Sequence, residues 1–481
     1  MAEKTLKSQT ASALVWSAID KIGLQIVLLI VGIINVRLLS PRDFGLIGAL
    51  AIFTLLSSVL IESGFSVAMI RRKGNTDAEY SAVFFFNLGI SILLYLMLFF
   101  SAPAIAEFFR MPELCSLSRF LFLSIILNSL GIVQNIILSI KLSFKLMSIA
   151  NIVSAIVACA VSVTMACTGW GYWALAWQMV LLPAVKVAIL WSFNSWRLSF
   201  NCDFRVIREL FSFSSFLLLN SIFSSIVQNS YNILIGRFYR ADDLGFYSQA
   251  KKYQQVPSAV ISEILSGVSY PVLSKLNAES NRQQLYLRKI IRINAFLIFP
   301  LMLGMASIIE PLVSIVMTDK WLPAVPYFLC LVPVSILTPL VAINYRFLIL
   351  KGHPRLMSML EIAKNATILL SLFACKHSIL LMLIVFSAIN LLSYGSYLFF
   401  VEKKTDYSAL QQLKDIMPYA AVAGVMFLLA KGIGLVSPFG LYSTTALQIV
   451  LSIAFYFGVL KLLGSQVLAD TQEMLRKILP F

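Results

Sequence analysis

The chain has 481 residues, of which 59% are hydrophobic and 12% are charged, and its formal net charge is +16. A mean hydropathy of +0.87 excludes a soluble globular domain of this length and indicates a polytopic membrane protein. The Lys and Arg residues are spread over short segments between apolar runs, a distribution that argues against a nucleic-acid partner.

Apolar runs of membrane-spanning length occur along the whole chain. Windows of about 20 apolar residues predict fourteen transmembrane helices, six in the first part, six in the second and two at the end. They cover 14–36, 45–70, 81–101, 119–140, 146–168, 172–193, 211–235, 253–274, 293–317, 325–350, 357–375, 379–400, 418–436 and 442–463. The predicted fold class is therefore an all-α polytopic membrane protein.

A short polar link after the first predicted helix returns 200 residues later. The copies share an arginine, an aspartate and a glycine, namely Arg37, Asp43 and Gly45, then Arg237, Asp243 and Gly245. Further sequence similarities, between 102–105 and 310–313 and between 145–148 and 355–358, follow in the same order. The chain therefore looks duplicated.

The duplication predicts a six-helix lobe in 1–196, a second in 197–404, and a terminal helix pair with an amphipathic tail in 405–481. Because each repeat has an even number of helices, both run in the same direction, and their pseudo-twofold axis is expected along the membrane normal. Such lobes face each other across a central cleft, as in an alternating-access transporter. Lys and Arg are more frequent on the side of the N-terminus, which places both termini in the cytoplasm.

Signatures of catalysis are missing from the sequence. The six cysteines lack metal or disulfide spacing, and no Gly-Lys dipeptide offers a phosphate-binding Walker loop. No long loop forms an extramembrane domain. We therefore expect no enzyme activity, no metal and no cofactor.

Three features of the sequence resemble those of a known protein family. They are the motif Arg37, Leu39, Pro41, Phe44 and Gly45, its second copy, and the run 247–250 that leads to a proline at 257. The chain resembles the polysaccharide flippases of the MOP exporter superfamily, in particular the WzxC-like lipopolysaccharide and exopolysaccharide exporters. The resemblance implies translocation of an undecaprenyl-diphosphate-linked oligosaccharide (an O-antigen, capsule or exopolysaccharide unit) across the bacterial inner membrane. It also implies membrane lipids, a polysaccharide polymerase and glycosyltransferases as partners.

A lipid-linked sugar diphosphate needs cations for its phosphates and polar groups for its sugars. Charged residues within membrane helices usually face a cavity or a partner. The substrate-binding candidates in the predicted helices are Asp20, Lys21, Gln25, Lys186, Asn220 and Arg346. For Lys21 and Arg346 the alternative is that each snorkels to the headgroups.

Carboxylates inside the predicted helices have a second possible role. Glu263 falls near the middle of its helix and Glu62 is its near-equivalent in the first repeat, so both are candidates for ion coupling. The alternative is that each pairs with a lysine across the cleft. Glu361 and Lys364 are predicted to form a local pair, and in each link an Arg–Asp pair is expected to be structural.

Two other functions fit parts of this pattern. A multidrug or cation antiporter of the same superfamily would share the architecture. A membrane-embedded glycosyltransferase or polymerase would normally bring a large outer loop or a metal-binding acidic pair, and the sequence has neither.

Overall fold

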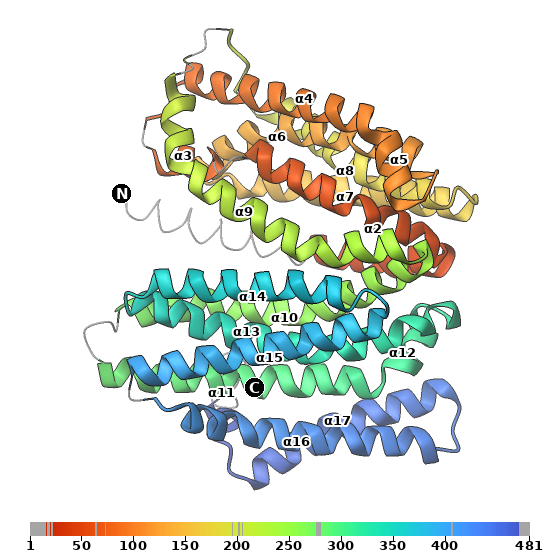
Figure 1. Cartoon of the computed structure of the whole chain (residues 1–481), viewed down its shortest axis with the longest axis vertical. Coiled ribbons are helices and arrows are strands. Elements are labelled where there is room, and N and C mark those ends of the chain that lie inside the picture. The colour runs from red at the N-terminus through yellow and green to blue at the C-terminus, as the bar shows by residue number, and fades with distance from the viewer. Residues whose placement is uncertain are drawn as a thin grey trace. The chain divides into compact units, whose positions relative to one another are not determined.

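The computed structural model describes residues 16, 20, 23–62, 65–72, 74–194, 196–200, 203, 205–275, 280–405 and 407–470. The regular structure in these residues is helical. The chain divides into two compact units, Met1–Gly245 and Phe246–Phe481, each of which is a bundle of helices that lie side by side (Figure 1).

The first unit begins with the apolar helix Gly23–Leu38. It continues through α2 (Pro41–Glu62), α3 (Phe65–Arg71), α4 (Asp77–Phe109), α5 (Leu114–Leu121), α6 (Leu123–Ile140), α7 (Phe144–Cys167), α8 (Tyr172–Phe193) and α9 (Arg205–Phe238). Small buried residues on α7, including Ala150, Ser154 and Ala158, let α8 pack closely against it.

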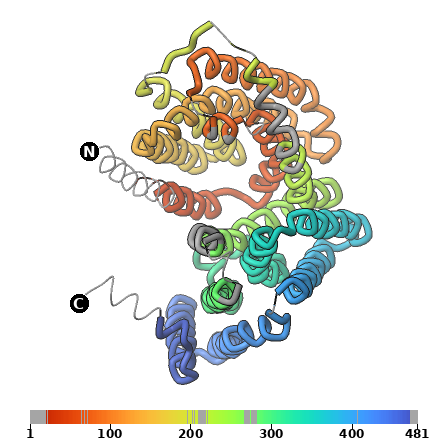
Figure 2. The backbone as a smooth tube through the Cα atoms, turned by 90° about the vertical axis from the view of Figure 1, so that its left-hand side faces the viewer, coloured from red at the N-terminus to blue at the C-terminus, as the bar shows by residue number. Residues whose placement is uncertain are grey.

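The second unit contains most of α10 (Ala241–Lys275), whose first turn belongs to the first unit. It continues through α11 (Ser280–Ser307), α12 (Ile309–Val316), the 3-10 helix η1 (Asp319–Ala324), α13 (Val325–Leu350), α14 (Pro354–Ala374), α15 (Ile379–Lys404), α16 (Ala409–Val436) and α17 (Leu441–Leu462). Figure 2 looks roughly along the helices, so that many of them appear foreshortened.

The terminal pair α16 and α17 is part of the core of the second unit. Phe296 on α11 packs edge-on against Tyr419 of α16, with ring centroids 6.0 Å apart. The Tyr456 hydroxyl of α17 donates a hydrogen bond of 2.9 Å to the Phe296 carbonyl oxygen. The pair is therefore anchored to α11 by both apolar and polar contacts.

Eleven of the described helices are long and apolar enough to cross a membrane. Together with 23–38, α9 and α10 they are compatible with the predicted fourteen crossings. Several helices extend past the predicted spans, since α10 begins at Ala241 rather than near 253 and α16 at Ala409 rather than near 418. An apolar window detects only the part of a helix that lies in hydrocarbon.

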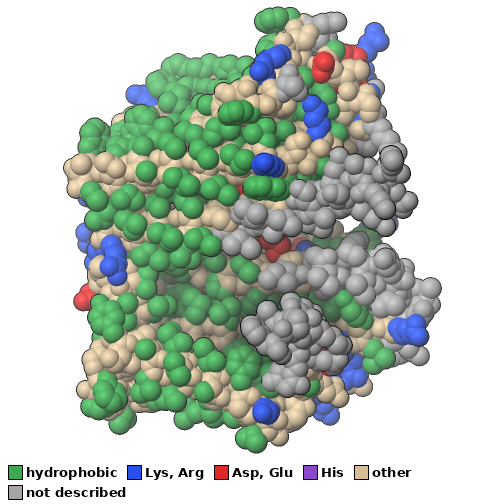
Figure 3. Space-filling view, turned by 180° about the vertical axis from the view of Figure 1, so that it is seen from behind, with side chains coloured by type: hydrophobic (Ala, Val, Ile, Leu, Met, Phe, Trp, Pro, Cys, Tyr) green, Lys and Arg blue, Asp and Glu red, His purple; other side chains and the backbone are tan. Residues whose placement is uncertain are grey.

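Large apolar side chains are exposed along many of these helices. Phe100, Leu392 and Leu435 are 75%, 73% and 87% exposed, and Figure 3 shows hydrophobic side chains over wide areas of the surface. A water-soluble protein rarely exposes apolar patches of this extent. The surface is that of a multi-pass membrane protein, whose helices face lipid.

Candidate functional site

The non-helical link is shorter than the repeated motif. This is because α2 begins at Pro41, so that the motif residues from there on are helical. Asp43 Oδ2 accepts hydrogen bonds from the backbone N–H and the hydroxyl of Ser40, at 2.8 and 2.7 Å. Asp243 Oδ2 likewise accepts from the Arg240 backbone N–H, at 3.2 Å. Each aspartate is the third residue of its helix and accepts from the backbone N–H of the residue just before that helix, as the acidic residue of a capping box does.

Arg237 does not form the Arg–Asp pair that we expected within its link. Its guanidinium donates to the carbonyl oxygen of Phe108 and lies 5.1 Å from the centre of that ring. The two copies themselves meet where Gly45 and Gly245 bring their backbones together. These contacts lie within the first unit, and the structural role expected of the link residues stays a prediction.

A charged cluster lies among the helices of the first unit. Both carboxylate oxygens of Asp20 are 3.0 Å from Nδ2 of Asn151 on α7. Lys186 on α8 is half-buried, and the negative charges of Asp20 and Glu62 both act on its ammonium group. Segments far apart in the sequence therefore bring two carboxylates and one cation together.

The Lys186 ammonium makes no hydrogen bond or close ion pair with any residue that the structure describes. The two carboxylates balance its charge through space and leave its three N–H donors available. An ammonium group in this position can bind an incoming anion. The predicted alternative for Glu62 was a pair with a lysine across the cleft; in the structure Glu62 acts on Lys186 of the same unit through space and forms no close ion pair with it.

Buried amides continue the polar interior of this unit. Nδ2 of Asn35 donates to the Ser162 hydroxyl at 3.0 Å and to Oε1 of Gln178 at 3.3 Å. Gln178 in turn donates to the Cys159 sulfur at 3.3 Å. These contacts join the first helix to α7 and α8 through buried polar groups.

The remaining substrate candidates are placed separately. Lys21 lies outside the described residues, and so does the side chain of Asn220, although its helix α9 is described. Gln25 is exposed on the first helix, and Arg346 is half-buried near the C-terminal end of α13. The structure therefore brings together Asp20 and Lys186 from the predicted set.

Glu263 lies on α10 in the second unit, and its side chain is exposed. We expected burial on an apolar helix face. Polar neighbours along this helix, Gln254 and Ser258 among them, show that α10 is not uniformly apolar. Ion coupling by Glu263 remains a proposal that needs a direct test.

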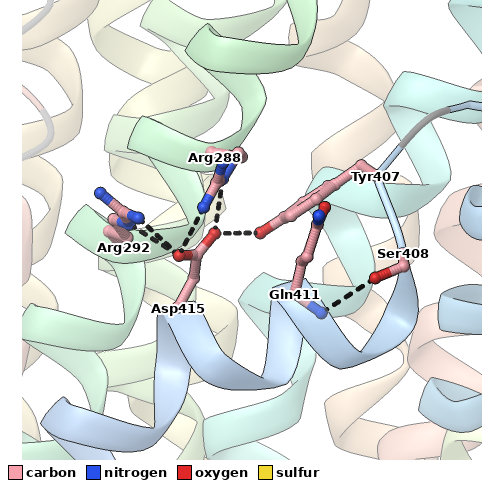
Figure 4. Close-up of polar contacts among 6 residues, drawn as sticks. All are labelled: Arg288, Arg292, Tyr407, Ser408, Gln411 and Asp415. Carbon is pink, nitrogen blue, oxygen red and sulfur yellow. Dashed lines mark hydrogen bonds and ion pairs between the residues drawn. The ribbon is translucent and has the colours of Figure 1, made fainter.

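A polar cluster that the sequence did not reveal lies in the second unit (Figure 4). Asp415 on α16 is 6% exposed and accepts hydrogen bonds from two arginines of α11. Arg288 donates to it at 2.8 and 3.1 Å, and Arg292 at 3.0 and 2.6 Å. The two arginines are four residues apart and so share one helix face, which is the signal that could have pointed to the cluster.

Tyr407, in the loop before α16, completes this cluster. Its hydroxyl donates to Oδ2 of Asp415 at 2.8 Å. Burial, and then the hydrogen bond to Asp415, raise the pKa of Tyr407 above its ordinary value, so the hydroxyl keeps its proton and remains a donor. Asp415 thus receives donors from α11 on one side and from the loop on the other.

Glu361 and Lys364 form the local pair that their spacing predicts, with 2.7 Å between Nζ and Oε2. The Tyr397 hydroxyl of α15 also donates to Glu361, at 2.7 Å. This pair is satisfied within its own unit. It is therefore a structural feature rather than a second substrate site.

Solved structures with this fold are membrane transporters. "Lipid II flippase MurJ, inward closed conformation" superposes with a TM-score of 0.73 and 14% identity, covering 92% of this chain and 97% of that one. An inward-facing multidrug resistance MATE family transporter of the MOP superfamily gives a TM-score of 0.59 and 14% identity, covering 85% and 98%. At these identities the likeness shows the fold.

Sequence relatives extend over most of the chain. The Teichuronic acid biosynthesis protein TuaB of Bacillus subtilis (strain 168) is 27% identical in an alignment of 448 residues that covers 90% of this chain and 90% of that protein. The Lipopolysaccharide biosynthesis protein WzxC of Escherichia coli (strain K12) is 23% identical, covering 69% of this chain and 68% of that protein. The model of the polysaccharide biosynthesis protein family matches residues 34–326. This match spans more than half of the sequence, so the chain belongs to the polysaccharide biosynthesis protein family.

Proposed function

We propose that this protein is a flippase that moves an undecaprenyl-diphosphate-linked oligosaccharide across the bacterial cytoplasmic membrane by alternating access, with both termini in the cytoplasm. Membership of the polysaccharide biosynthesis protein family supports the substrate class. The shared fold with a protein named as a lipid II flippase supports the reaction. A polymerase and glycosyltransferases are the proposed partners, and the transport step itself makes or breaks no covalent bond.

The observation that carries the proposal is the half-buried ammonium group of Lys186, which has no hydrogen-bond acceptor among the described residues. A diphosphate offers charged oxygens, and a hydrogen bond between ionised groups is roughly twice as strong as a neutral one. Lys186 is therefore the residue that we assign to the substrate phosphates. Lys21, next to Asp20 in the sequence, would supply a second cation.

In this proposal, Asp20 and Glu62 stabilise the charge of Lys186 while no substrate is bound. An isolated ammonium group within a membrane helix is costly, and nearby carboxylates reduce that cost. Asn151 holds Asp20 in place through its hydrogen bonds. When the substrate arrives, its phosphates compete with the two carboxylates for the Lys186 charge, so binding remains reversible.

The proposed transport cycle uses the repeats. The predicted lobes, 1–196 and 197–404, would rock about an axis along the membrane normal and open the cleft to one side at a time. The pair within 405–481 would follow the second lobe, since α16 and α17 pack on α11. The contact between the repeated links would act as the pivot of this motion.

The test is removal of the two cations one at a time and together. Lys186→Ala and Lys21→Ala are each expected to reduce surface polysaccharide, and the double variant to abolish it, at unchanged protein level. Lys186→Arg should retain part of the activity, because it keeps the charge. Lys364→Ala is the matched control, since that lysine is paired within its own helix. The same variants should lose flipping of a lipid-linked oligosaccharide in proteoliposomes.

Normal export by the double alanine variant would remove Lys21 and Lys186 from the substrate site. The MATE-like fold also allows a multidrug or cation antiporter. That function predicts accumulation or efflux of organic cations by the proteoliposomes and no flipping of the lipid-linked sugar. The two assays on one preparation separate the two functions.

A further inference from the structure

A helix that is continuous in the first unit is broken in the second. Residues 102–105 near the end of α4 correspond to 310–313 in the repeat, so the last turns of α4 are the equivalent of α12. α4 runs through its proline in this stretch to Phe109 without interruption. In the second unit a turn at Ile308 separates α11 from α12, which follows as a short helix (Figure 1). Both stretches contain the proline, so the proline alone does not explain the break.

The two ends of α12 are weakly held. Ile308, the residue before it, has no side-chain oxygen, and within the described part of the chain no side chain caps the first turn. At the other end Thr318 has a φ of 81° and a ψ of 161°, a conformation that is populated almost only by glycine. Backbone strain of this kind occurs in segments that switch between positions. α12 therefore lies between two joints.

A cavity of about 180 Å³ lies against one face of α12. Ile309, Leu312, Val313 and Val316 line it, and their spacing places them on the same side of the helix. Residues of α10, α11, η1 and α13 form the rest of the wall. Protein interiors contain few voids larger than a water molecule. This cavity therefore leaves room for the apolar face of α12 to move inward.

An ion pair joins the start of α12 to the terminal helix pair. Oε1 of Glu310, in the first turn of α12, lies 3.3 Å from Nζ of Lys431 on α16. The two side chains are 58% and 34% exposed, and pairs with this exposure contribute little to stability. The contact can hold α12 in place and still break at small cost.

We propose that α12 is a gate of the second unit. It turns about the joints at Ile308 and Thr318, from its present position to one in which its apolar face fills the cavity, and the ion pair holds the present position. Hinged segments of proteins turn in this way about a few residues at the ends of helices. The cavity also touches the first half of α10, so the gate lies at the end of the second unit where α10 enters it.

The gate has a place in the proposed transport cycle. With cytoplasmic termini, α10 begins at the outer side of the membrane, so the gate would open the second lobe toward that side. This role rests on the proposed flippase function. The motion itself is a property of the chain and can be measured without a substrate.

The experiment uses the full chain with its native cysteines replaced by serine. Spin labels on Glu310→Cys with Lys431→Cys report the distance between α12 and α16 by electron paramagnetic resonance. Since the labels replace the ion pair, two distance populations are expected. Ser437→Cys with Thr444→Cys is the matched control, because these hydroxyls join the end of α16 to the start of α17 with 2.9 Å between their oxygens. One population is expected there.

The same variants test the gate in transport. Joining the thiols at 310 and 431 with a short cleavable cross-linker should stop flipping of a lipid-linked oligosaccharide in proteoliposomes, and cleavage should restore it. The control pair should flip equally well with or without the cross-link. Adding Thr318→Gly to the labelled variant should increase the population that has the present distance, because glycine adopts this conformation without strain.

A single distance population in both double variants would overturn the gate. So would undiminished flipping after the thiols at 310 and 431 are joined. If two populations are present but the unlinked variant flips no lipid-linked sugar, the flippase proposal fails and the gate stands. The distance measurement and the transport assay therefore separate the two proposals.

Discussion

Gly45 and Gly245 each lie where the other copy of the repeated link leaves no room for a side chain. A Cβ atom on Gly45 would lie 1.8 Å from the carbonyl oxygen of Ala241, and one on Gly245 would lie 1.9 Å from that of Pro41. The contact is thus reciprocal, as expected when two equivalent segments pack around a pseudo-twofold axis. It gives a physical reason for a glycine in both copies of the motif.

We therefore predict that Gly45→Ala and Gly245→Ala destabilise the protein by about 1–3 kcal/mol or more, because backbone atoms have to move to admit a methyl group. Thermal unfolding of the detergent-solubilised protein measures the effect. Gly89→Ala is the control, since this glycine lies within α4 of the same unit and its Cβ would meet nothing within 4 Å. Equal melting temperatures for Gly45→Ala and Gly89→Ala would contradict the contact.

The Asp415 cluster leads to a second stability prediction. Asp415→Asn keeps the shape of the side chain but leaves Arg288 and Arg292 without their shared carboxylate. Since the arginine side chains are 31% and 32% exposed, water offsets part of the loss, and we expect roughly 1–3 kcal/mol of destabilisation. The measurement is the midpoint of thermal unfolding.

Asp470→Asn serves as the control for Asp415→Asn. Asp470 pairs with Lys289 at 2.6 Å, but these side chains are 51% and 54% exposed, and such pairs contribute about 0–1 kcal/mol. If both variants lower the melting temperature equally, burial is not what makes the Asp415 contact strong. Tyr407→Phe should cost less than Asp415→Asn, because it removes a single neutral donor.

The orientation in the membrane gives a third prediction. Arg240 is exposed in the second copy of the link, and Arg355 is exposed at the start of α14. With cytoplasmic termini, a cysteine at Arg240 should react with a membrane-impermeant thiol reagent added outside intact cells, and a cysteine at Arg355 only after the cells are opened. The native cysteines are first replaced by serine. The reverse pattern would invert the proposed topology.

Hydropathy was enough to predict an all-α membrane fold, because burial in lipid requires long apolar runs whatever their neighbours are. The same reasoning missed Asp415, since α16 begins nine residues before the apolar window near 418 and the polar first turns carry the cluster. Nor does the sequence show that Trp196 is buried beside Tyr80 and Trp191. Such contacts join segments distant in the sequence, so spacing along the chain does not reveal them.

The sequence pointed to some residues of the charged cluster and missed others, again because the missed contacts join distant segments. Asp20 and Lys186 stood out because charge within a membrane helix is costly. Asn151 did not, because a neutral amide on a helix has many possible partners and only the fold shows that it holds both oxygens of Asp20. The proximity of Glu62 to Lys186 likewise depends on how α2 and α8 pack.

The last prediction concerns coupling of transport to protons. Glu62 and Asp20 both attract Lys186, so a proton bound at Glu62 would weaken the hold on that lysine and favour its contact with the substrate phosphates. Glu62→Gln imitates the protonated carboxyl group. We expect this variant to flip the lipid-linked sugar at high pH as the parent protein does at lower pH. Glu263→Gln tests the other candidate under the same imposed pH gradients in proteoliposomes. If a variant keeps the pH dependence of the parent protein, the residue replaced in that variant is not a coupling group. If both variants keep it, export is driven by the substrate gradient rather than by protons.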